Sequence, residues 1–83
     1  MENMKDLINA KIRHLSSLKI HLEGYDPHRT ENDILRVKAT ARMLSTDIAD
    51  ILDVAKAMNE ITEDEYFTYY QKTSKLRNSH TLV

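Results

Sequence analysis

Histidines are the first side chains to test for metal chemistry in this chain. His14 and His21 lie seven residues apart in a stretch with helical periodicity, so they share one helix face but stand about 10 Å apart along its axis. One zinc ion cannot reach both, and the spacing of four residues that a helical zinc site needs is absent. His28 and His80 fall in an expected turn and an expected tail. The sequence therefore predicts no metal site.

Acids and hydroxyls give no better pattern for catalysis. Asp47, Asp50 and Asp53 step by three residues, so on a helix they follow one exposed side, whereas acid and base catalysis needs carboxylates held in different environments. Ser17 and Ser45 have no neighbouring histidine or lysine for a catalytic triad, and a single glycine cannot make a phosphate loop. We predict no catalytic residues, no cofactor and no enzymatic activity.

The aromatic residues are strongly clustered. The segment EYFTYYQK, residues 65–72, holds four of the five aromatic side chains. The helical repeat places its three tyrosines on one face, which we expect to be core, while Phe67 lies about 100° round the helix from Tyr66. Phe67 is either the edge of that core or an anchor for another protein, since buried aromatic contacts dominate interface energies. The candidate partner-binding residues are Phe67, Asp50, Asp53 and Tyr69.

Charge is unevenly distributed although the formal net charge is only −1. Residues 47–65 contain seven acids and one lysine, while the segment from residue 70 onward is purely basic. Basic residues also gather in the first half of the chain, which suggests an alternative function in DNA or RNA binding, although acids lie in the same half and no helix-turn-helix signature is present. The candidate nucleic-acid-binding residues are Arg36, Lys38 and Arg42.

Periodicity predicts an antiparallel hairpin of two long helices. Apolar residues recur at helical spacing over about residues 2–23, and the sequence GYDPH then supplies a C-terminal glycine and a proline that cannot continue the helix. A second helix is expected over about 31–58, with Thr30 as its N-cap. Its apolar positions alternate spacings of three and four, which is a heptad pattern.

A short third helix is expected over about 63–77. The sequence ITEDEY combines a capping box, between Thr62 and Glu65, with a hydrophobic staple. We expect this helix to fold back over the end of the second helix, which should extend beyond the first. The residues that it should cover are Leu52, Val54, Ala55 and Met58. Residues 78–83 are expected to form a frayed tail.

Two limited resemblances accompany this pattern. The segment ITEDEYFTYYQKTSKL resembles the short C-terminal helical motif of many small bacterial proteins, with Glu60 in place of the usual glycine and Tyr69 and Tyr70 in place of lysines. The overall plan is similar to small plasmid- and phage-encoded helical regulators that act as dimers of hairpins. Neither resemblance implies a role for a particular residue.

The sequence thus predicts a single all-α domain over residues 1–83. A chain of 83 residues without cysteine buries a marginal core, so we expect self-association into a dimeric helical bundle. The first residues resemble neither a signal peptide nor a membrane span, which favours the cytoplasm. The expected function is that of a small non-enzymatic regulator or adaptor that binds another protein. Regulators encoded by phages or mobile elements are the class of protein that we expect. The candidate self-association residues are Val37, Leu44, Ile48 and Ile51.

Overall fold

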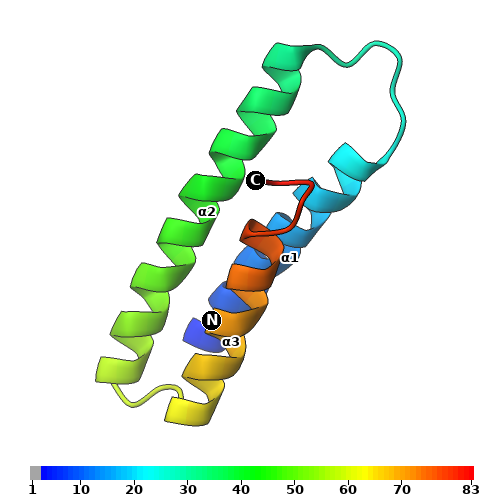
Figure 1. Cartoon of the computed structure of the whole chain (residues 1–83). Helices are drawn as coiled ribbons and strands as arrows, with labels where there is room; N and C mark the ends of the chain where they lie inside the picture. Colours follow the sequence, from blue (N-terminus) through cyan, green and yellow to red (C-terminus); the bar gives the residue numbers. More distant parts are fainter. Residues whose placement is uncertain (1–2) are drawn as a thin grey trace.

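Three α-helices pack into one bundle in the computed structural model, which describes residues 3–83 (Figure 1). They are α1 (Met4–Glu23), α2 (Glu31–Ala57) and α3 (Glu63–Arg77). Each helix packs against both of the others. In Figure 1, α2 forms one side of the molecule, with α1 and α3 together on the other. The all-α fold expected from the periodicity is confirmed.

Local capping explains where the helices begin. Thr62 accepts a hydrogen bond from the backbone N–H of Glu65, and the Glu65 carboxylate accepts one from the N–H of Thr62, at 3.1 and 2.9 Å. This is the expected capping box, and α2 begins with a second one, between Thr30 and Asp33. Bonds from Thr30 hold the pKa of Asp33 below its ordinary value, because they stabilise the carboxylate.

The connection between α1 and α2 differs in detail from the expectation. Gly24 ends α1 with an extended backbone (φ −74°, ψ 142°), so the left-handed conformation that favours glycine is not used. Arg29 instead provides hydrogen bonds to the carbonyl groups at the end of α1. Its guanidinium donates to the carbonyl oxygens of His21, Leu22 and Gly24, at 2.7, 3.3 and 2.9 Å.

Asn59 makes the turn between α2 and α3. It has a φ of 60°, in the left-handed region, which asparagine tolerates better than most residues. The N–H groups of Asn59 and Glu60 donate to the carbonyl oxygens of Lys56 and Ala55, at 3.0 and 2.9 Å. These two bonds form a Schellman motif, which closes the end of α2 and directs the chain back toward α1.

The core lies along α2. Ile48, Leu52 and Ala55 are fully buried there, as are Ile8 and Leu15 of α1. In α3, only Thr73 is buried, but the residues that flank this helix contribute Ile61 and Leu82, which are 5% and 3% exposed. Tyr66, Tyr69 and Leu76 of α3 are half-buried against the same core, so the helix is held along its inner face as well as by the segments that flank it.

The expected overhang of α2 beyond the start of α1 is not found. Lys5 pairs with Glu65 at 2.8 Å, and Asn3 and Met4 lie beside Glu60, so α1 begins level with the end of α2. The loop instead rises from α1 to the start of α2 (Figure 1). Leu52 and Ala55 are buried as expected, but Val54 and Met58 remain 49% and 61% exposed, because Val54 lies about 160° round α2 from Leu52 and Met58 caps the end of the helix.

Residues 78–83 turn back against the bundle. The N–H of Leu82 donates to the carbonyl oxygen of Ser79 at 3.1 Å, and Leu82 lies beside Ala41 of α2. This arrangement differs from the expected frayed tail, because one apolar side chain near the end of the chain enters the core. None of the helices found in residues 3–83 is long and apolar enough to cross a membrane.

Candidate functional site

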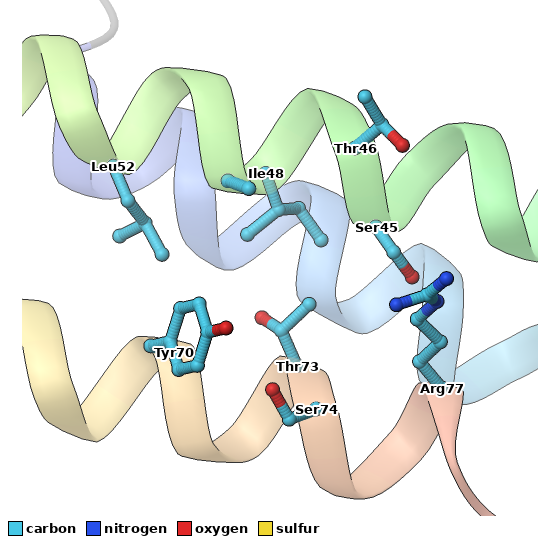
Figure 2. A pocket seen from close by; sticks show the side chains of 9 residues that line it. Ser45, Thr46, Ile48, Leu52, Tyr70, Thr73, Ser74 and Arg77 are labelled. Atoms are coloured by element: carbon cyan, nitrogen blue, oxygen red, sulfur yellow. The ribbon is translucent and has the colours of Figure 1, made fainter.

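A shallow groove of about 200 Å³ runs between α2 and α3 (Figure 2). The fully buried Ile48 and Leu52 lie beneath it, and Tyr70 and Arg77 of α3 stand toward its two ends. Small residues keep the space between the helices open. Those that line it are Ser45, Thr46, Ala49, Thr73 and Ser74.

Three aromatic rings gather at the Tyr70 end of this groove. The Tyr66 ring packs edge to face against Phe67, with centroids 5.6 Å apart, and stacks on Tyr70 at 6.2 Å. Both separations are in the range of favourable aromatic pairs. We call Tyr66, Phe67 and Tyr70 the aromatic cluster.

Tyr66 connects the aromatic cluster to α2. Its hydroxyl donates to the Asp53 carboxylate at 3.0 Å, and the Lys56 ammonium lies 4.7 Å from the centre of its ring. The bond to Asp53 raises the pKa of Tyr66, because a phenolate beside a carboxylate would be disfavoured. These contacts hold the ring in one orientation without burying the cluster.

The other two rings of the aromatic cluster are accessible. Phe67 is 51% exposed and Tyr70 is 48% exposed. Phe67 therefore lies largely outside the core, and its role as an anchor stays a prediction. The prediction that Tyr70 is a core residue is wrong, because Thr73 occupies the centre of the α3 face and Tyr70 lies at its edge, above the groove.

The remaining predicted partner-binding residues lie in different places. Tyr69 packs against the core, and its hydroxyl accepts from the Asn9 amide at 3.4 Å, so this side chain belongs to the contact between α1 and α3. Asp53 joins the aromatic cluster through Tyr66. Asp50 is exposed but lies about 60° further round α2 than Asp53. Phe67 and Asp53 thus both contact the Tyr66 side chain, and Asp50 lies one turn before Asp53 on α2.

The predicted nucleic-acid-binding residues do not share one face. Lys38 and Arg42 are one turn apart on α2; Lys38 lines a hollow with Thr81, and Arg42 lines one with Arg77. Arg36 points about 120° away from Arg42 by the helical repeat. Three other cations of this half are engaged, whereas Arg13 is exposed: Lys11 pairs with Asp47 at 3.8 Å, Lys19 pairs with Glu23 at 2.8 Å, and Arg29 caps α1.

The predicted self-association residues lie mostly inside the chain's own bundle. Ile48 is 0% exposed and Leu44 is 8% exposed, while Val37 and Ile51 are half-buried against the same core. Their apolar surface is covered by α1 and α3, so these residues do not form a face for a second copy. Sequence reasoning identified the stripe correctly but could not decide which helices cover it.

Within residues 3–83, no three histidine or carboxylate side chains are placed to hold a metal ion together. The chain matches no protein-family model, and neither the curated proteins nor the solved structures contain a significant match to it. The resemblance of residues 61–76 to a bacterial C-terminal motif thus remains a local similarity of sequence.

Proposed function

We propose that this protein is a small non-enzymatic cytoplasmic regulator or adaptor that binds another protein through the aromatic cluster and the adjoining groove. The observation that carries the proposal is the half exposure of Phe67 and Tyr70 on either side of an anchored Tyr66. Aromatic side chains of this kind supply large contact areas at little cost in conformational entropy.

The groove supports this proposal because it offers a seat for an apolar side chain. Ile48 and Leu52 lie beneath it and are fully buried, so the surface open to a partner comes from Tyr70, Ala49 and the small polar residues beside them. A partner residue that enters between Tyr70 and α2 would cover this surface and the exposed ring of Tyr70. Most of the binding energy is expected from that central contact, as in other interfaces.

Charge indicates the chemistry of the partner. Asp53 lies beside the aromatic cluster, and Glu63 and Asp64 are exposed in the first turn of α3, just before Phe67. Two cations lie near these acids: Lys56 faces Glu63 at 4.0 Å, and Lys72 lines one hollow with Asp64. We therefore expect a partner segment with an apolar or aromatic residue flanked by lysine or arginine.

The test is a comparison of variants in partner capture from a nuclease-treated lysate of the host. Phe67→Ala and Tyr70→Ala should each weaken binding by about 2 kcal/mol or more, because they remove central aromatic contacts. Both variants should fold, because their exposed rings contribute about 1 kcal/mol or less to stability. Isothermal titration with the captured partner gives the affinities, and circular dichroism gives the helix content.

Tyr25→Ala is the matched control. Tyr25 lies in the turn between α1 and α2 and is 93% exposed, so the same chemical change there removes an aromatic ring far from the groove. Binding should be unchanged in this control. If Phe67→Ala and Tyr70→Ala bind like the unaltered protein, the aromatic cluster is not the binding surface.

Nucleic-acid binding through the first half of α2 is the alternative function. The single observation in its favour is that Arg42 and Arg77 line one hollow, with Lys38 one turn away. Binding of this kind would weaken steeply with salt, because each neutralised phosphate releases counterions. Capture that disappears after nuclease treatment and on Arg42→Ala would replace the proposed function with this one.

A further inference from the structure

The outer face of α2, opposite the groove, has an ordered pattern of charge. On this face Arg36 is exposed in the first half of the helix, and Asp50 is exposed in the second. Met43, near the middle, is 68% exposed. The helix dipole accounts for Glu31 and Asp33 in the first turn of α2 and for Lys56 in the last, but its effect falls off within one turn of each end, so it does not account for Arg36 and Asp50.

Three of these residues lie almost in line. Arg36, Met43 and Asp50 are spaced by seven residues, which is a rotation of about 20° from exact alignment per step. Arg36 and Asp50 are thus each about 10.5 Å from Met43 along the axis, on opposite sides of it. We call Arg36, Met43 and Asp50 the outer stripe.

The outer stripe has side chains that remain to be paired. Neither Arg36 nor Asp50 forms an ion pair in residues 3–83. The acid one turn before Arg36 is Asp33, whose carboxylate accepts from the N–H of Thr30 at 3.0 Å in the capping box. Apolar surface accompanies the charges, because Val54, about 20° round the helix from Met43, is 49% exposed.

From this geometry we infer that a second copy of the chain binds the outer face of α2 in an antiparallel, two-fold symmetric dimer centred at Met43. The two-fold axis places Met43 against the same residue of the other copy. Arg36 of each copy then lies opposite Asp50 of the other, so the contact is self-complementary, as a symmetric dimer interface must be. A parallel arrangement would instead place like charges together.

This dimer leaves the aromatic cluster free. In Figure 1, α1 and α3 lie on one side of α2, and the outer face of α2 lies on the opposite side. The groove opens between α2 and α3. A dimer through the outer stripe would therefore present two aromatic clusters. The inference does not depend on the proposed function, because it rests on different residues of α2.

Charge reversal with sedimentation equilibrium tests the pairing. The unaltered protein should dimerise at tens to hundreds of micromolar. Arg36→Glu and Asp50→Arg should each raise the dimer dissociation constant at least about tenfold, because each places like charges opposite one another twice. A mixture of the two variants should restore the dimer, since the glutamate introduced in one would face the arginine introduced in the other. The second contact of that mixed dimer would again join Arg36 to Asp50.

Arg13→Glu is the control, because Arg13 is an exposed residue of α1 and the same reversal there should leave the dissociation constant unchanged. A monomer at every concentration overturns the inference. Equal dimerisation in the unaltered protein and both single variants also overturns it, as does a mixture that fails to associate.

Disulfide trapping tests the position of the axis. The chain has no cysteine, so Met43→Cys introduces a unique thiol that should meet its counterpart and cross-link on mild oxidation. Met58→Cys provides an equally exposed control about 22 Å along the helix from Met43, and hence about 45 Å from its counterpart in this dimer. Faster cross-linking through residue 58 than through residue 43 would refute the proposed register.

Discussion

Helices α2 and α3 are held in the bundle in different ways. Six residues spread along α2 are buried, whereas α3 buries only Thr73 along its length. The third helix contacts the core through Thr73 and the half-buried Tyr66, Tyr69 and Leu76, and Ile61 before it and Leu82 after it enter the core. Phe67 and Tyr70 lie off this inner face, which explains how they remain half exposed in so small a protein.

The largest expected effect is in the middle of α2. Ile48→Ala should reduce the free energy of unfolding by about 2–5 kcal/mol, because it removes fully buried methyl groups and leaves a cavity. Urea denaturation followed by circular dichroism measures this loss. Ser17→Ala, at an exposed position of α1, should change stability by less than about 0.5 kcal/mol, and equal losses in both variants would mean that the core is elsewhere.

The C-terminal fastening of α3 should be the next most sensitive. Leu82→Ala should reduce the free energy of unfolding by about 2 kcal/mol, at the low end for a buried leucine because the site is near the chain end. Val83→Ala is the control, since Val83 is 71% exposed. A frayed tail, as the sequence suggests, would make the two variants equally stable in urea denaturation.

The turn between the helices should show a smaller effect. Asn59→Val should reduce the free energy of unfolding by about 1–2 kcal/mol, because a β-branched residue disfavours the left-handed φ of 60°. Asn59→Gly keeps that conformation accessible and should be close to neutral. If both substitutions have the same effect in thermal unfolding, the Schellman motif does not set the entry to α3.

The smallest expected effect is on pH dependence at the start of α3. The hydrogen bond from Lys5, followed by the bond from the N–H of Thr62, lowers the pKa of Glu65 below its ordinary value. The folded state therefore favours the carboxylate, and this stabilisation is present above the ordinary pKa of about 4.3. This stabilisation is lost as the pH falls through the lower pKa that Glu65 has in the folded state.

Glu65→Gln should consequently reduce the fall in melting temperature between neutral pH and about pH 3. The same substitution at Glu60, an exposed residue of the preceding turn, is the control and should leave that fall almost unchanged. Thermal unfolding by circular dichroism at a series of pH values gives the comparison. A variant at Glu65 with the pH profile of the unaltered protein would show that the contact with Lys5 adds nothing to stability.

The sequence by itself determined the local features. The period of the apolar residues predicted all three helices, and the capping residues Thr30 and Thr62 marked two of their starts. These features depend on neighbours within about four residues, so they can be read directly along the chain. The apolar stripe of α2 was identified for the same reason.

Only the tertiary structure decided how those helices meet. It assigned Arg29 to the end of α1, brought Leu82 into the core and left Tyr70 at the surface. It also joined Asp53 to the aromatic cluster and separated Asp50 onto the outer stripe, although the two acids are three residues apart. Such outcomes depend on the register between helices, which is set by contacts between residues far apart in sequence and not by the period of either helix alone.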